Sequence, residues 1–196
     1  DWLSAIEEFY KDYDKVDQDT RAKNYEKAME ALTRKYPDDV EAKIFYALAL
    51  NETFDHKTMA NLTKAIEILE PIDKQYPDHP GVTHYLIHSY DYPPIAKQGL
   101  VAAKAYSGIA PDAAHALHMP AHIFTRVGYW KESTAANRES ARVAGDRSVD
   151  GHHAADYMVY AYLQMAQDEA ARKAMQYSLG LKPIDNFAAA FAYAAM

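Results

Sequence analysis

Cysteine is absent from the 196-residue sequence. Its absence excludes disulfides, thiolate metal sites and a cysteine nucleophile, and it fits a cytoplasmic or a periplasmic protein equally well. Glycine is also scarce, with seven scattered residues. The sequence therefore contains no glycine-rich phosphate loop and no Gly-x-Ser-x-Gly nucleophile elbow.

Long runs of one residue class are also missing. No apolar stretch approaches the roughly 20 residues that a membrane-spanning helix needs. No basic run occurs, and the formal net charge is −7. Nucleic acids and anionic membrane surfaces, which are bound through clustered Lys and Arg, are therefore not expected as partners. The zinc-protease motif is absent too, because Tyr85 follows His84 and Met119 follows His118.

The residues that are abundant favour helices. Hydrophobic residues make up 49% of the chain, which is enough for a sizeable core, and the strong helix formers Ala, Leu, Lys, Glu and Met are plentiful. Apolar residues recur at helical spacing, and no segment shows the alternation typical of strands. We expect an all-α protein forming one domain over residues 1–196.

Four segments begin in a similar way, each with an aspartate that can cap a following helix. These are Asp38, Asp78, Asp112 and Asp150, separated by 40, 34 and 38 residues. A period of 34 residues is typical of tetratricopeptide repeats, and the longer intervals fit loop insertions. Asp38 and Glu41 also have the spacing of a capping box. The pattern predicts helices at 2–13, 19–36, 39–52, 58–76, 79–91, 94–109, 113–127, 130–144, 152–166, 168–180 and 185–196.

The sequence resembles the tetratricopeptide repeat superfamily. The segments HPGVTHYLIHSYDYPP, APDAAHALHMPAHIFTRVGYW and DYMVYAYLQ also resemble longer bacterial tetratricopeptide proteins. This resemblance implies an α-solenoid of antiparallel helix pairs wound into a right-handed superhelix. It further implies that the first helix of each pair lines a concave groove, where a peptide, a protein or a small ligand binds.

Histidines recur at fixed distances from the capping aspartates. Six and ten residues after Asp78 are His84 and His88, and the same steps after Asp112 give His118 and His122. The same steps after Asp150 give Asp156 and Tyr160. Three residues after Asp112 is His115, and three residues after Asp150 is His153. Residues four apart share one helix face. The apolar stripe of these helices lies on a different face, formed by Leu86, Ile87, Tyr90, Ala121, Phe124, Met158, Val159 and Tyr162.

This second face suggests a metal site. His84, His88, His118 and His122 supply imidazole nitrogens, and Asp156 supplies a nearby oxygen, so we expect them to hold a Zn, Cu, Ni or Fe ion. A ligand would contact the other polar residues of the face, which are Asp91, Tyr92, His115, Arg126, His153, Tyr160 and Gln164. Repeat duplication alone, or hydrogen bonds among the histidines, Tyr and Asp, also explain the pattern.

Two functions are therefore compatible with the sequence. One is a binding scaffold whose His-, Tyr- and Asp-lined groove captures a peptide or small ligand, with or without a transition metal. The other is a metal-dependent hydrolytic or redox enzyme, in which the ion activates water or substrate and Asp156 or a histidine acts as the base.

Two further positions bear on this face. Pro120 lies inside the predicted helix 113–127, where it favours a kink; the alternative is that a new helix begins at Pro120, which would leave His115 and His118 on a loop. His152 falls outside the groove register, and we expect it to be solvated.

The ends of the sequence suggest a longer protein. The chain opens at Asp1-Trp2 within a predicted helix and closes on the apolar segment 185–196. Repeat arrays usually end with a solvated face. We expect a fragment of a longer chain, or self-association through the last helix.

Overall fold

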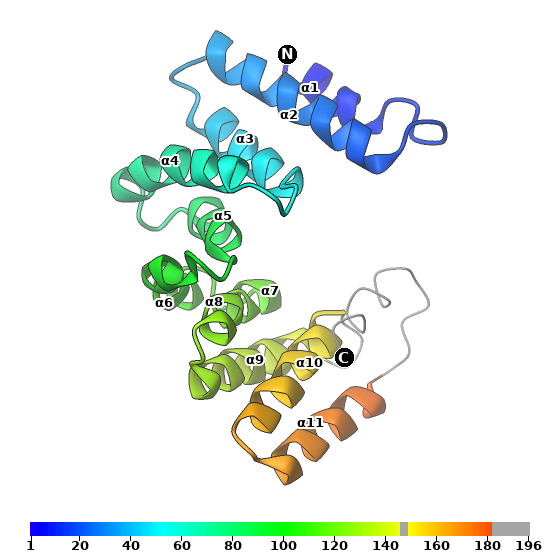
Figure 1. The fold of residues 1–196 in the computed structure, drawn as a ribbon, viewed down its shortest axis with the longest axis vertical. Coiled ribbons are helices and arrows are strands. Elements are labelled where there is room, and N and C mark those ends of the chain that lie inside the picture. The colour runs from blue at the N-terminus through cyan, green and yellow to red at the C-terminus, as the bar shows by residue number, and fades with distance from the viewer. Residues whose placement is uncertain (146–148, 182–196) are drawn as a thin grey trace. The chain divides into compact units, whose positions relative to one another are not determined.

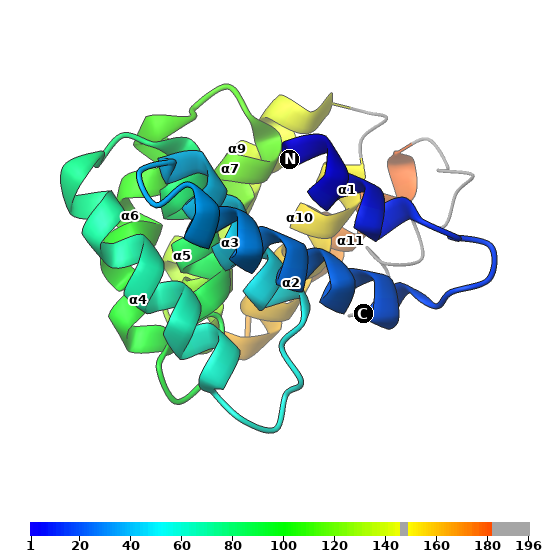
Figure 2. The ribbon, with the colours of Figure 1, turned by 90° about the horizontal axis from the view of Figure 1, so that it is seen from above.

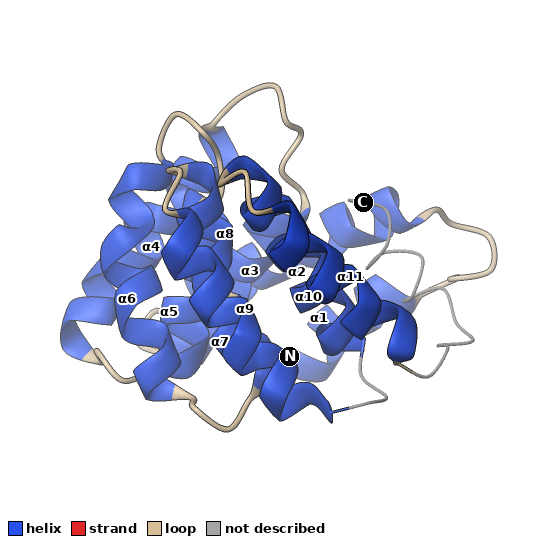
Figure 3. Ribbon diagram, turned by 90° about the horizontal axis from the view of Figure 1, so that it is seen from below, coloured by secondary structure: helices blue, strands red, loops and turns tan. Residues whose placement is uncertain are grey.

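The computed structural model describes residues 1–145 and 149–181, and within these ranges it contains helices and connecting loops but no strand (Figure 1; Figure 3). The described residues form an all-α helical-repeat fold, as the sequence predicts. Two compact units can be distinguished, Asp1–Ser89 (unit 1) and Tyr90–Met196 (unit 2). The predicted helix 185–196 lies outside the described residues.

Unit 1 is built from helices that pack on their neighbours in sequence, with α1 on α2, α2 on α3 and α3 on α4. Figure 2 shows α1 and α2 side by side. Its core consists mainly of Ala, Leu, Ile and Met side chains. The helices are α1 (Trp2–Tyr10), α2 (Gln18–Lys35), α3 (Val40–Glu52), α4 (Ala60–Gln75) and α5 (Pro80–Tyr90), the last of which ends at the start of unit 2.

In unit 2, α9 packs against α7, α8 and α10, and α10 packs against α7 and α11. Its elements are a 3-10 turn η1 (Ala96–Gly99), α6 (Leu100–Ile109), α7 (Ala114–His118), α8 (Pro120–Arg126), α9 (Trp130–Ala144), α10 (Val149–Gln164) and α11 (Asp168–Gly180). Leu86, Ile87, Tyr90, Ala121, Phe124 and Met158 are buried, which confirms the predicted apolar stripe at these positions. None of the described helices is both long and apolar enough to cross a membrane.

The predicted capping aspartates are wrong. Asp39, not Asp38, caps α3, and its carboxylate accepts from the Ala42 amide at 3.0 Å. At α5 the His79 ring replaces Asp78, because its Nδ1 accepts from the Val82 amide at 3.3 Å.

The later two repeats also differ from the expected caps. No side chain caps α7, which begins after Ala113, and α10 begins at Val149, so that Asp150 lies in its first turn. Several helix ends also differ from the predicted ones. The first helix ends at Tyr10, α4 begins at Ala60, and a 3-10 turn replaces the start of the predicted helix 94–109.

Pro120 begins a new helix, so the favoured interpretation of a kink inside one helix is wrong. It occupies the first turn of α8, where the missing N–H costs little. His115 and His118 nevertheless stay helical on α7, because only Met119 separates the two helices and its backbone is right-handed helical. The histidine face therefore continues through the interruption.

Candidate metal centre

The site residues occupy a fixed register once they are counted from the observed helix starts. The fifth residue is His84 in α5, His118 in α7 and His153 in α10. Four residues later, on the same face, come His88, His122 and Tyr157. Because α10 begins at Val149, the steps of six and ten from Asp150 lead to Asp156 and Tyr160, whereas the positions equivalent to the other two pairs are His153 and Tyr157. The step of three from Asp150 also reaches His153, which the sequence predicts as a ligand contact.

Unit 2 brings three histidines together. One ring nitrogen from each of His118, His122 and His153 lies within 4.8 Å of the other two. The Nε2 atoms of His118 and His122 are 3.0 Å apart. The His118 and His153 ring centroids lie 4.4 Å apart. His118 is almost fully buried, with 1% of its surface exposed.

A buried asparagine orients His118. His118 Nδ1 donates to Asn137 Oδ1 at 2.7 Å, while the Asn137 amide nitrogen donates to the Ser133 carbonyl at 2.8 Å. This second bond fixes which side of the amide faces the ring, because the opposite flip would set two oxygens against each other. Nδ1 of His118 therefore carries the hydrogen, and its Nε2 presents a lone pair toward His122.

A carboxylate orients His122 in the same way. His122 Nδ1 donates to Asp91 Oδ2 at 2.9 Å, and Arg126 Nε donates to Asp91 Oδ1 at 2.7 Å. The Tyr157 hydroxyl oxygen lies 3.2 Å from the same His122 nitrogen. Burial alone would raise the pKa of Asp91, but His122 and Arg126 outweigh it and lower that pKa below its usual value. Asp91 is therefore an ionised acceptor at neutral pH.

The surroundings keep two of the rings neutral. Burial, reinforced by His122 and His153, holds the pKa of His118 well below 6.5. Burial, followed by the charges of His122 and His115, lowers the pKa of His153 to about 4. Neutral imidazole is the form that ligates metals. Burial also raises the pKa of Tyr157, so its hydroxyl keeps its proton.

His153 has a buried nitrogen that no other described group satisfies. Its Nδ1 is shielded from solvent and has no hydrogen-bond partner among residues 1–145 and 149–181. A buried polar atom without a partner lowers the stability of the fold by about 1–3 kcal/mol. The His153 side chain therefore favours binding of an outside group that would pair with this nitrogen.

The other residues predicted for the metal are placed differently. In unit 1, His84 and His88 form a second pair, with their Nε2 atoms 3.1 Å apart. Whether both pairs share one ion stays a prediction. Asp156 is buried, and desolvation raises its pKa to about 6. Within the described ranges it makes no hydrogen bond to the histidines and is not part of the three-nitrogen cluster.

The residues predicted to contact a ligand surround the cluster only in part. His115 Nδ1 lies 3.9 Å from Asp150 Oδ1, and its ring centroid is 6.2 Å from that of His118. Arg126 is about half exposed, and Tyr160, which is 49% exposed, lies edge-on to Trp130.

Tyr92, Gln164 and His152 do not belong to the cluster in the part of the chain that the structure describes. Tyr92 is half-buried and Gln164 is exposed, and a ligand-binding role for either stays a prediction. The expectation that His152 is solvated is wrong, because it is buried and its Nδ1 lies 3.1 Å from Ser178 Oγ.

Known proteins resemble this chain in structure. No known protein family and no curated protein matches the sequence. Solved structures do match. Residues 41 to the end of MamA from Desulfovibrio magneticus RS-1 align with a TM-score of 0.66 at 11% identity, over 81% of this chain and 84% of that one. TTC0263, a thermophilic TPR protein from Thermus thermophilus, aligns with a TM-score of 0.63 at 16% identity, over 89% and 90%. The chain has a tetratricopeptide-like fold.

Two residues of the site, Asn137 and Tyr157, are not among those predicted from the sequence. Both nevertheless leave a trace. Asn137 is a polar residue in the middle of the predicted helix 130–144, and Tyr157 follows His153 by the four-residue step that separates His118 from His122. Measuring each repeat from its own helix start, not from an aspartate, would have found Tyr157.

Proposed function

We propose that this tetratricopeptide-like protein is a binding scaffold whose unit 2 holds one divalent transition-metal ion through His118, His122 and His153. The bound ion would serve as an anchor for a peptide or small ligand. The observation that carries this proposal is the 3.0 Å separation of the His118 and His122 Nε2 atoms.

That separation supports a cation between the two rings. Asn137 and Asp91 hold the hydrogens of the two rings on Nδ1, so two Nε2 lone pairs face each other. Lone pairs repel at this distance unless a proton or a metal ion lies between them. Two nitrogens bound to one tetrahedral ion at 2.0–2.1 Å are about 3.3 Å apart, so the rings need to separate by only about 0.3 Å.

A metal ion fits the surroundings better than a proton. A proton would satisfy only the two Nε2 atoms, whereas an ion could also be bound by His153, one of whose ring nitrogens lies within 4.8 Å of a nitrogen from each of the other two rings. The hydrogen bonds from His118 to Asn137 and from His122 to Asp91 are the supporting contacts that metal-bound imidazoles usually have.

The ligand set indicates the kind of ion and its role. Imidazole nitrogens suit Zn, Cu, Ni or Fe, and they suit Mg or Ca poorly. Three protein ligands leave a fourth position of a tetrahedral ion for an outside group. A carboxylate or an imidazole of a bound peptide has the chemistry to fill it.

The test is metal titration of protein freed of its purification tag. We expect Zn²⁺ to bind to chelator-treated protein much more tightly than Mg²⁺ does. His122→Gln and His153→Gln should each weaken this binding by at least about tenfold, because each removes one of three ligands. His56→Asn is the matched control: it removes an imidazole from a loop position with positive φ, which Asn tolerates, and should leave binding unchanged.

Three results would contradict the proposal. One is Zn²⁺ binding that survives both cluster substitutions with the fold intact by circular dichroism. Another is Mg²⁺ binding of equal strength. The third is no transition-metal binding together with a nitrogen NMR spectrum in which His118 and His122 share a proton; the cation between the rings would then be that proton.

A further inference from the structure

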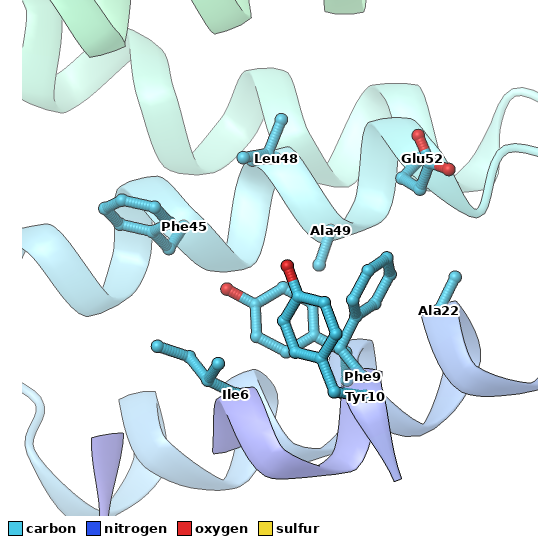
Figure 4. A pocket seen from close by; sticks show the side chains of 9 residues that line it. Ile6, Phe9, Tyr10, Ala22, Phe45, Leu48, Ala49 and Glu52 are labelled. Carbon is cyan, nitrogen blue, oxygen red and sulfur yellow. The ribbon is translucent and has the colours of Figure 1, made fainter. Parts of the chain in front are cut away.

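Unit 1 contains a separate cavity of about 420 Å³ on the side of α1, α2 and α3. Figure 4 shows its aromatic and aliphatic walls, with Glu52 at one end. The lining is apolar apart from this carboxylate and the tyrosine hydroxyls. Its residues are Ile6, Phe9, Tyr10, Ala22, Tyr25, Phe45, Leu48, Ala49 and Glu52.

The cavity occupies the register that carries histidines in later repeats. Ile6 and Tyr10 are the fifth and ninth residues of α1, and Leu48 is the ninth residue of α3. The face that is polar in α5, α7 and α10 is therefore apolar in α1 and α3. Ile6 and Tyr10 are 42% and 62% exposed, so apolar surface stays open to solvent beside the cavity.

Aromatic packing gives the cavity a fixed wall. The Phe9 ring lies edge-on to Tyr10 at 5.2 Å and to Tyr25 at 5.8 Å between centroids. The Arg21 guanidinium lies 5.5 Å from the Phe9 ring and donates to the backbone carbonyls of Val16 and Phe9, which holds it in place. This arrangement presents rings to the cavity and leaves Glu52 as its one lining carboxylate.

Charge is distributed unequally between the units. Unit 1 has 18 acidic and 11 basic residues, which gives −7, whereas unit 2 has 10 of each and is neutral. The whole net charge of the chain therefore belongs to the unit that contains the cavity. Exposed Glu52, which accepts from Gln18 at 3.4 Å, adds a negative charge at the cavity itself. Such a surface attracts cationic partners and repels anionic ones.

We propose that the cavity binds a bulky apolar side chain of a basic peptide segment from a partner protein. An apolar anchor would fill the space between the rings, and flanking Lys or Arg residues would meet Glu52 and the acidic surface of unit 1. An extended segment suits this surface better than a small ammonium compound, because the charge is spread over the unit and several cations are needed to use it.

The experiment uses a fluorescently labelled synthetic peptide with a central tryptophan and lysines on both sides, titrated with the full chain and followed by anisotropy. The same peptide with the tryptophan replaced by serine should bind at least about tenfold more weakly, as should a peptide with the lysines replaced by glutamates. Binding should also weaken as salt rises, because exposed charges are screened.

Paired variants locate the site. Tyr10→Ala should weaken binding of the tryptophan peptide about tenfold. Tyr13→Ala, which removes a still more exposed ring that does not line the cavity, should change it less than about twofold. Glu52→Lys should weaken binding about fivefold, whereas Glu67→Lys on α4 makes the same charge change away from the cavity and should have little effect.

The inference would be overturned by a serine peptide that binds as tightly as the tryptophan peptide. Equal effects of Tyr10→Ala and Tyr13→Ala would overturn it as well. Ile6→Gln opens the same wall at another exposed position, so it tests the site independently if Tyr10→Ala disturbs packing against Phe9. Circular dichroism of each variant checks that α1 is intact.

Discussion

Asp91 lies at a position where one substitution tests the metal centre without touching a metal ligand. Its carboxylate accepts from His122 and from Arg126, and only 16% of the side chain is exposed. Asp91→Asn keeps an oxygen that can accept from His122 but removes the negative charge. Asp91→Ala removes both the acceptor and the charge.

The expected loss follows from the role of such contacts. Removing a hydrogen-bond partner of a metal-bound imidazole typically lowers metal affinity 10- to 100-fold, or about 1.4–2.7 kcal/mol. We therefore expect Zn²⁺ affinity to fall about tenfold in Asp91→Asn and about 100-fold in Asp91→Ala. Titration against a competing chelator measures both values. Asp112→Asn, an exposed aspartate of unit 2, is the control and should have no effect.

The same variant makes a prediction about pH. Since the pKa of Asp91 is lowered in the fold, its ionised form stabilises the protein at all pH values above about 3.9, and this contribution is lost as pH falls through the lower folded pKa. The difference in melting temperature between the wild-type protein and Asp91→Asn should therefore shrink below about pH 4. Unchanged Zn²⁺ affinity in Asp91→Ala, with the fold intact, would refute the reasoning.

Three further predictions concern unit 2. Asn137→Leu should destabilise the metal-free protein by about 1–3 kcal/mol in denaturant unfolding, because it leaves the buried Nδ1–H of His118 without an acceptor; an unchanged midpoint would contradict this. The lowered pKa of His153 means that the metal-free fold loses stability as pH falls from about 6.5 to about 4, by about 2 kcal/mol after allowance for solvent screening, and His153→Phe should flatten this part of the curve. Gly99→Ala should cost about 1–3 kcal/mol, since a Cβ would lie 2.7 Å from the neighbouring Tyr90 side chain, whereas Gly108→Ala meets no atom within 4 Å and should be neutral or stabilising in thermal melts.

The sequence predicted the repeat architecture because helix periodicity and spacing are local signals. The core positions Leu86, Ile87 and Phe124 follow directly from apolar residues at helical intervals, and all three are buried. Helix starts were less predictable, because adjacent residues compete to cap. At α3, Asp38 and Asp39 are both suitable, and the choice of Asp39 depends on how the preceding turn folds.

The part of the metal centre that depends on local spacing was predicted, and the part that depends on helix starts was not. His118 and His122 share a face whatever the helix start, since their spacing is four. Which residue of α10 joins the cluster depends on where α10 begins. Counting from Asp150 places the register three residues too late, at Asp156, whereas the residue in the nitrogen cluster is His153. The supporting contact from Asn137 joins α7 to α9. The sequence shows a polar residue inside a predicted helix at this position, but its local pattern does not indicate that the partner is His118. A ligand-binding groove, self-association through residues 185–196 and a single domain over the whole chain stay predictions.

The most direct test of the metal centre is an anomalous-scattering map from crystals of the Zn²⁺-loaded protein, recorded at the zinc absorption edge. We expect one strong peak at about 2.0–2.1 Å from a ring nitrogen of each of His118, His122 and His153. A crystal that contains zinc elsewhere on the chain, with the three rings in hydrogen-bonded contact and no peak among them, would contradict the proposal.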